Sequence, residues 1–207
     1  PAEDLYGQDA RVMTHQEFEK ELDDHEAAVK KAGSAVFIQC VGSREPGRPY
    51  CSRVCCTHTV ESALRLKKLN PDMDVYVLYR DMRTYGQREI LFQKARELGV
   101  MFIKYELDGK PRVTKEGDAL NVVVKDHVLL QDVLLKPDYL VLASAIVPHE
   151  NKELVELYKC AVNADGFLSE AHAKLRPVDM SVDGLFLAGL CHYPKPLDEA
   201  VAQAQAA

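Results

Sequence analysis

The sequence lacks the long apolar runs and the basic character that would indicate a membrane or nucleic-acid protein. No stretch approaches the roughly 20 apolar residues that a membrane-spanning helix needs. The 207 residues carry a net charge of −6, which argues against a nucleic-acid partner and an anionic membrane surface. The first ten residues, PAEDLYGQDA, show no secretory leader. We therefore expect a cytoplasmic protein without a membrane span, whose six cysteines are available as ligands.

Several cofactor-binding and catalytic motifs are also missing. No G-x-G-x-x-G fingerprint occurs, and without those glycines the backbone cannot approach a dinucleotide pyrophosphate closely. The paired C-x2-4-C knuckles of many structural zinc sites are absent. No Ser–His–Asp set or carboxylate pair has a spacing that indicates catalysis. Hydrolytic chemistry and an ordinary nicotinamide site are therefore not predicted.

What the sequence does have is a dense cysteine stretch at residues 36–66. It holds four cysteines with the spacing C-x10-C-x3-C-C: Cys40, Cys51, Cys55 and Cys56. Four such thiols can bind an iron–sulfur cluster, bind zinc, form disulfides or simply pack in the interior. Thiolate ligands of iron–sulfur clusters show varied spacings, and the start of the following helix would favour an anionic group. The pattern favours an iron–sulfur cluster and leaves the other readings open.

The rest of the N-terminal two thirds alternates between helix and strand patterns. Residues 14–29 are predicted to form a surface helix with a Thr14–Glu17 capping box, and residues 1–34 to form a helix and linker. Strands are predicted at 35–39, 74–79, 100–105 and 139–144, with helices beginning near Thr57 or Thr59 and at Gly86. Three short antiparallel strands are predicted at 112–114, 119–126 and 128–135. Residues 35–147 should therefore form one α/β unit with a parallel sheet and a β-meander.

Residues 148–207 are predicted to form a separate unit. It should contain a short helix within 148–159, strands at 166–168 and 184–188, and an alanine-rich C-terminal helix. A strand, a glycine at 189 and a helix start together form a common pocket for an anionic or electron-rich ligand.

Four long motifs resemble one known family. The runs FIQCVGSRE (37–45), YCSRVCCTHTVESALRLKK (50–68), VYVLYRDMRTYG (75–86) and GLFLAGLCHYPKPLDEA (184–200) resemble the A subunit of heterodisulfide reductase and its bacterial relatives. The resemblance extends from about Tyr6 to the last residue. It implies a flavoprotein with a thioredoxin-reductase-like core, so that residues 35–147 would be a Rossmann-like nucleotide domain and residues 148–207 the C-terminal portion of an FAD-binding domain.

The resemblance also implies cofactors and site residues. It implies that Cys40, Cys51, Cys55 and Cys56 bind a [4Fe–4S] cluster. It implies that FAD is faced by five residues near the C-terminus, namely Gly189, Leu190, Cys191, Lys195 and Pro196. His192 and Lys195 are expected to touch a flavin carbonyl or to stay solvated, and His58 to lie near the cluster or cap a helix. Arg80 and Arg83 are expected to be solvated residues at the end of a strand.

The family's FAD pyrophosphate-binding half and its ferredoxin-type cysteine runs are absent from these residues, so the sequence is expected to be a segment of a larger subunit. That segment would transfer electrons between FAD and partner subunits, with hydrogenase or dehydrogenase electron donors and a homo-oligomeric assembly. Alone, it is expected to be inactive and to purify without stoichiometric FAD. The alternative function is a zinc-stabilised interaction domain on a degenerate nucleotide-binding fold.

Overall fold

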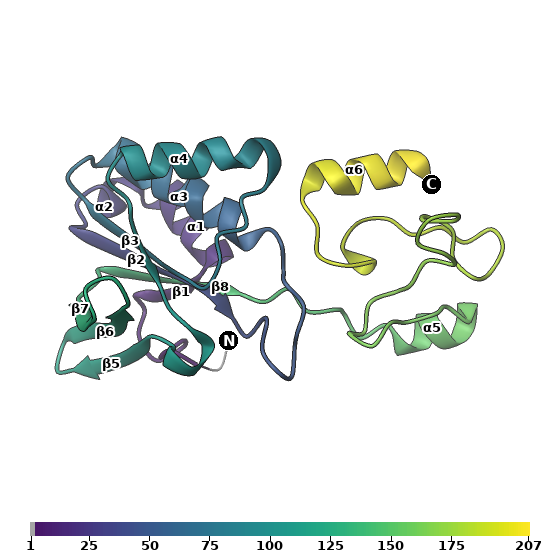
Figure 1. Ribbon diagram of the computed structural model, residues 1–207, viewed down its shortest axis with the longest axis horizontal. Helices are drawn as coiled ribbons and strands as arrows, with labels where there is room; N and C mark the ends of the chain where they lie inside the picture. Colours follow the sequence, from purple (N-terminus) through teal and green to yellow (C-terminus); the bar gives the residue numbers. More distant parts are fainter. Residues whose placement is uncertain (1–2) are drawn as a thin grey trace. The chain divides into compact units, whose positions relative to one another are not determined.

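The computed structural model describes residues 3–207, which form two compact units (Figure 1). The first unit comprises the described residues up to 42 together with 55–144, and the second comprises 43–54 together with 145–207. This division differs from the predicted one in three places. Residues 3–34 belong to the first unit, whereas the loop at 43–54 and residues 145–147 belong to the second.

The first unit is built on a five-stranded sheet with the strand order β1-β8-β2-β3-β4. Every neighbouring pair in it is parallel, which confirms the predicted fold class. Its strands are β1 (Val12–Thr14), β2 (Ser34–Val41), β3 (Asp74–Tyr79), β4 (Met101–Lys104) and β8 (Tyr139–Ser144). The short edge strand β1 was not predicted, because three residues are too few to show an alternating pattern.

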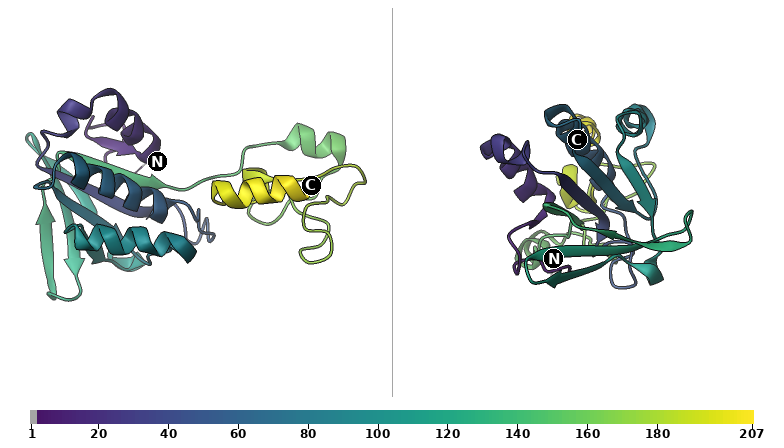
Figure 2. Two further views of the ribbon diagram at one scale, coloured as in Figure 1. Left: turned by 90° about the horizontal axis from the view of Figure 1, so that it is seen from above. Right: turned by 90° about the vertical axis from the view of Figure 1, so that its left-hand side faces the viewer.

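Helices cover one face of this sheet and a β-meander covers the other (Figures 1 and 2). The helices are α1 (His15–Asp24), α2 (Glu26–Val29), α3 (Cys55–Leu69) and α4 (Glu89–Glu97), the last preceded by the 3-10 turn η1 (Gly86–Arg88). The meander follows a second 3-10 turn, η2 (Leu107–Gly109). It contains the antiparallel strands β5 (Arg112–Glu116), β6 (Ala119–Asp126) and β7 (Gln131–Leu135).

Side chains of the central strand β2 alternate between two apolar cores, as the period of a strand requires. Phe37 packs in a core with α1, α3 and α4, whereas Val36 and Ile38 pack in a core with the meander. A strand that is buried on both faces has a continuous run of apolar residues, and this explains why β2 could be predicted from the sequence.

The N-terminal helix belongs to the first of these cores. Its predicted capping box between Thr14 and Glu17 is present, and its apolar residues Phe18, Leu22 and Val29 are all fully buried. Helix α1 ends at Asp24, and a separate short helix carries Val29. The region therefore completes the core of the first unit.

The second unit has little regular structure. Its elements are α5 (Lys152–Tyr158), the 3-10 turn η3 (Gly189–Cys191) and α6 (Leu197–Ala206). The strands predicted at 166–168 and 184–188 are wrong. Only single bridges form there, Val162 with Leu168 and Asp179 with Phe186, since the described part of this unit supplies no neighbouring strand that would extend them into a ladder.

Within residues 3–207, no helix is both long enough and apolar enough to cross a bilayer.

Candidate functional site

Cys40 lies at the carboxyl end of β2, where the backbone is irregular. The register of β2 against β8 shifts between Ile38 and Val41, and Cys40 is buried with a φ of 62°. A non-glycine residue in this left-handed region costs about 1 kcal/mol or more, and such residues concentrate at functional sites. The hydroxyl of Tyr105 donates a hydrogen bond to the carbonyl of Gln39 at 2.5 Å. This bond fixes the peptide that leads into Cys40.

Cys55 and Cys56 form the first two residues of α3. The predicted cap at Thr57 or Thr59 is therefore wrong, because both threonines lie inside the helix. The first turn contains no acidic residue, so the positive end of the helix dipole favours an anion at this point. The thiol of Cys56 lies 3.7 Å from the carbonyl oxygen of Asp81, which follows β3.

Cys51 lies in the loop at 43–54 of the second unit, and its thiol is not part of a disulfide. Its Sγ accepts the backbone N–H of Arg53 at 3.3 Å. The residues on either side are hydrogen-bonded to the backbone of Ile146. The hydroxyl of Tyr50 donates to the carbonyl of Ile146, and the N–H of Ile146 donates to the hydroxyl of Ser52, each at 2.9 Å. The position of Cys51 within this unit is therefore well defined.

The loop that joins Cys40 to Cys55 carries unusual backbone strain. Arg44 and Arg53 have φ angles of 58° and 62°, so that three of the seven described non-glycine residues with positive φ lie between residues 40 and 53. Glycine would adopt these angles more readily, and the positions are filled by larger residues. This strain is a second sign that the cysteine stretch is shaped for a function.

The four cysteines are divided between the two units. Three of them belong to the first unit and Cys51 to the second. Across the described part of the chain, no three Cys, His, Asp or Glu side chains lie close enough to hold one ion. Ligands of a mononuclear zinc site converge on one point, whereas a four-iron cluster distributes its thiolates over separate irons. The donor set of four cysteines and the helix start of α3 are compatible with such a cluster.

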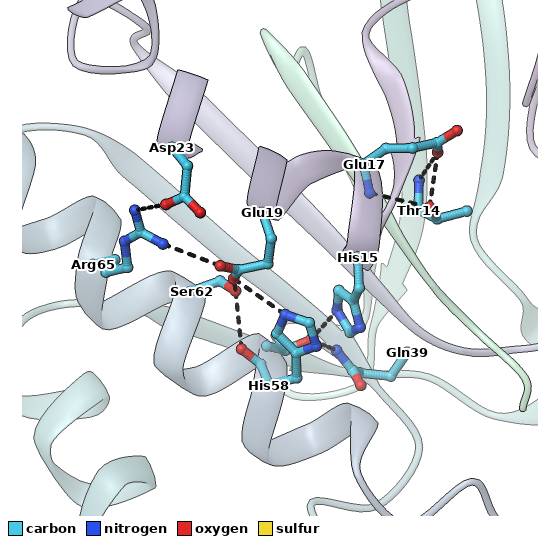
Figure 3. A network of polar contacts seen from close by, with 10 residues as sticks. Thr14, His15, Glu17, Glu19, Asp23, Gln39, His58, Ser62 and Arg65 are labelled. Atoms are coloured by element: carbon cyan, nitrogen blue, oxygen red, sulfur yellow. Dashed lines mark hydrogen bonds and ion pairs between the residues drawn. The ribbon is translucent and has the colours of Figure 1, made fainter. Parts of the chain in front are cut away.

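A polar network ties α3 to α1 (Figure 3). The carboxylate of Glu19 accepts hydrogen bonds from His58 at 3.1 Å, Ser62 at 2.9 Å and Arg65 at 3.0 Å, and Arg65 also contacts Asp23 at 2.7 Å. His58 is therefore engaged by Glu19 on α1 and caps no helix. The network fixes the helix that carries Cys55 and Cys56.

A buried histidine lies at the centre of the same helix contact. His15 Nε2 lies 2.7 Å from the hydroxyl of Thr59, which also accepts a hydrogen bond from the side-chain amide of Gln39. Burial, with the nearby His58 ring as a smaller cause, lowers the pKa of His15 from 6.5 to about 3. This group was not predicted, because a lone histidine beside a helix cap forms no recognisable pattern.

The five predicted flavin-facing residues lie around η3 and the start of α6. Gly189 opens η3 with a φ of 76°, Leu190 and Cys191 are exposed, and Pro196 precedes α6. Lys195 is only 4% exposed. Neither Lys195 nor His192 is solvated, and both ring nitrogens of His192 are already within hydrogen-bond reach of side chains of this unit.

Lys195 is the centre of a second buried network. Its amino group contacts His192 Nδ1 at 3.2 Å and the side-chain oxygen of Gln203, and it lies 4.0 Å from the centre of the Tyr193 ring. The backbone N–H of Gly189 donates to the same Gln203 oxygen at 3.0 Å. Burial lowers the pKa of Lys195. Neither Gln203 nor Glu170, the carboxylate beside His192, was predicted, because both lie away from the cysteine and glycine positions of the motif.

Of the two arginines predicted to be solvated at the end of β3, only one is exposed. Arg83 is exposed, but Arg80 is buried at 7% exposure. A buried guanidinium does not offer a surface contact to an incoming phosphate. The remaining exposed arginine is a weak basis for a nicotinamide nucleotide site.

No protein-family model matches the chain, but comparison with solved structures defines the class of fold. The thioredoxin reductase of Lactococcus lactis in its FR conformation aligns with all of this chain and 58% of its own, with a TM-score of 0.63 and 17% identity. The fold is thus Rossmann-like and of the thioredoxin-reductase type.

Curated sequences that are similar to this chain are A subunits of heterodisulfide reductase. The A subunit of the H(2):CoB-CoM heterodisulfide,ferredoxin reductase of Methanothermobacter thermautotrophicus (strain Delta H) is 40% identical over 185 residues, which make up 86% of this chain and 28% of that protein. An iron-sulfur A subunit of the CoB--CoM heterodisulfide reductase of Methanopyrus kandleri is 37% identical over 186 residues, with the same coverage. The chain is therefore homologous to one segment of the A subunit of heterodisulfide reductase, and spans little more than a quarter of these relatives. The resemblance seen in the motifs is confirmed.

Proposed function

We propose that this chain is an electron-transfer segment of a flavin- and iron–sulfur-containing oxidoreductase subunit of the heterodisulfide reductase A type. Cys40, Cys51, Cys55 and Cys56 would hold a [4Fe–4S] cluster, which supplies one-electron chemistry when bound. The element from Gly189 to Pro196 would face the flavin of FAD. Electrons would pass between FAD and partner subunits.

The observation that carries the cluster assignment is the placement of the thiols on the first unit. Cys40 ends the central strand on a left-handed backbone, and Cys55 with Cys56 begins the next helix. Cys51 precedes Cys55 by four residues, so the extended chain limits their separation to roughly 14 Å. The site would hold an anionic group against the positive end of the α3 dipole.

The flavin assignment is supported by how the second unit exposes its surface. Its large buried apolar side chains, among the described residues, are Phe167, Met180 and Leu187, whereas other large apolar side chains such as Leu157, Leu175 and Leu197 are 72%, 79% and 80% exposed. A unit with so small a core is expected to pack against further protein. We infer that it completes an FAD-binding domain whose other half grips the pyrophosphate.

The relatives' names support a role within a complex of several subunits. Those proteins are named as subunits, and some names include ferredoxin. We infer that this chain works in the cytoplasm with other subunits of such a complex, as a homo-oligomer, and receives electrons from a hydrogenase or dehydrogenase. The separated segment would be inactive.

The test combines metal analysis with flavin analysis on anaerobically purified protein. Replacement of any one of four cysteines with serine should lower the iron and sulfide content, because a hydroxyl is a poor substitute for thiolate. These cysteines are Cys40, Cys51, Cys55 and Cys56. Cys160→Ser, at a half-buried cysteine of the second unit, is the matched control and should retain the full content. The 207-residue chain should carry iron without stoichiometric FAD, whereas the full-length subunit should carry both.

Two outcomes would contradict the proposal. Full iron retention in all four serine variants would exclude the cluster assignment, and one zinc per colourless chain would favour the zinc-stabilised interaction domain. Stoichiometric FAD on the short chain would show that the pyrophosphate site lies within these residues.

A further inference from the structure

Three titratable side chains of the second unit form a continuous hydrogen-bonded series. His192 Nε2 lies 2.8 Å from Glu170 Oε2, and His192 Nδ1 lies 3.2 Å from Lys195 Nζ. The histidine and lysine are 8% and 4% exposed, whereas the Glu170 side chain is 23% exposed. The series therefore runs from water at Glu170 into the interior at Lys195.

The surrounding contacts determine which nitrogen of His192 carries the proton. The N–H of Gly189 must donate to Gln203, so the oxygen of that amide faces Gly189 at 3.0 Å. The amide nitrogen of Gln203 then donates to His192 Nδ1 at 2.7 Å, which makes Nδ1 an acceptor. The ring proton is consequently on Nε2 and is donated to the Glu170 carboxylate.

The ionisation of the three groups agrees with this arrangement. Burial lowers the pKa of His192, which favours the neutral ring. Hydrogen bonds, first from its own backbone N–H and then from His192, lower the pKa of Glu170, which favours the carboxylate. Besides His192, which contacts it directly, the charged and titratable groups that act on Lys195 are Cys191, Arg53, Glu199 and Glu170.

At the inner end of the series, the side chain of Gln203 holds the acceptor position that a ligand would have to take over. Two donors, the Lys195 amino group and the Gly189 N–H, converge on one acceptor, the side-chain oxygen of Gln203. A ligand edge with carbonyl oxygens or ring nitrogens presents the same kind of acceptor. Gly189 and Lys195 are both residues that the proposed flavin site includes.

We propose that Glu170, His192 and Lys195 form a proton relay between water and the ligand edge at Gly189. In the outward direction, Lys195 Nζ gives a proton to His192 Nδ1, the proton on Nε2 passes to Glu170 Oε2, and Glu170 releases a proton to water. The reverse sequence delivers one proton to Lys195. The relay rests on the proposed flavin site, because it is the reduction and oxidation of a flavin that would require the protons.

The first test needs no flavin and uses the 207-residue chain. Long-range 1H–15N correlation spectra should show His192 with its proton on Nε2. Glu170→Ala should lower the pKa of His192 and Lys195→Met should raise it, because the first removes a negative and the second a positive neighbour. Glu153→Ala, which removes an exposed carboxylate from the same unit, should change neither property. A proton on Nδ1, or a His192 pKa that is the same in all variants, would overturn the relay.

The second test uses the full-length subunit with its FAD. Glu170→Ala should slow proton-coupled flavin reduction at least 10-fold at unchanged FAD content, and added acetate should restore the rate in proportion to its concentration. A purely structural role for Glu170 would give no acetate rescue, and that result would refute the relay. A full-length subunit that purifies without FAD would instead refute the flavin site and with it this use of the relay, whatever the spectra show for His192.

Discussion

His15 should make the first unit sensitive to mild acid. His15 is the first residue of α1 and its buried ring contacts Thr59 of α3, and its pKa falls from 6.5 to about 3 in the folded protein. Between these values the unfolded chain binds a proton that the folded chain does not, so stability rises with pH in this window and is lost as pH falls through it. At about 1.4 kcal/mol for each unit of pKa, the loss from pH 7 to pH 5 is about 2 kcal/mol.

The matching variant is His15→Gln, since glutamine can keep the hydrogen bond to Thr59 and does not titrate. Urea unfolding followed by circular dichroism at pH 7, 6 and 5 should show the variant gaining about 2 kcal/mol on the wild type as the pH falls. His127→Gln is the control, because that ring is exposed at the β6–β7 turn. Parallel stability curves for wild type and His15→Gln, or an NMR titration of the His15 ring near pH 6, would refute the reasoning.

Two further predictions concern the carboxyl end of the sheet. NADH and NADPH should bind no more tightly than roughly 1 mM by calorimetry, about 4 kcal/mol, because the glycine loop is absent and Arg80 is buried; micromolar binding would show an unrecognised phosphate site. Tyr105→Phe should lower the free energy of unfolding, measured with urea, by about 1 to 3 kcal/mol, because the Gln39 carbonyl loses its hydroxyl partner. The control Tyr158→Phe, at an exposed ring, should not lower it. Equal stabilities of wild type and Tyr105→Phe would show that water replaces the hydroxyl.

The centre of the parallel sheet was predictable because β2 and β8 are buried on both faces. Continuous apolar runs such as that of β2 appear directly in a sequence, and strand β3 has the predicted bounds of 74–79. In contrast, the predicted strand at 128–135 begins only at Gln131. Asp126 accepts the N–H groups of Val128 and Leu129 at 2.7 and 3.0 Å, and this local turn outweighs the strand propensity of the apolar residues.

The second unit shows where sequence patterns fail. The run GLFLA at 184–188 has the composition of a strand, but strand propensity measures how well side chains fit a half-buried pleated surface. Phe186 is 54% exposed and makes one isolated bridge. The buried networks were equally invisible, since Glu170 lies 25 positions before Lys195 and only the folded chain joins them through His192.

The site proposed for the cluster agrees with a general property of parallel sheets. In open α/β folds, ligands bind beyond the carboxyl ends of the strands, at the point where the chain leaves neighbouring strands in opposite directions. Here β2 has β3 on one side and β8 on the other, and Cys40 lies at the end of β2. A phosphate at this point would need glycines for close backbone approach. The donor atom of a thiolate ligand lies on a side chain, away from the backbone. A cluster can therefore bind at the same edge of the sheet without those glycines.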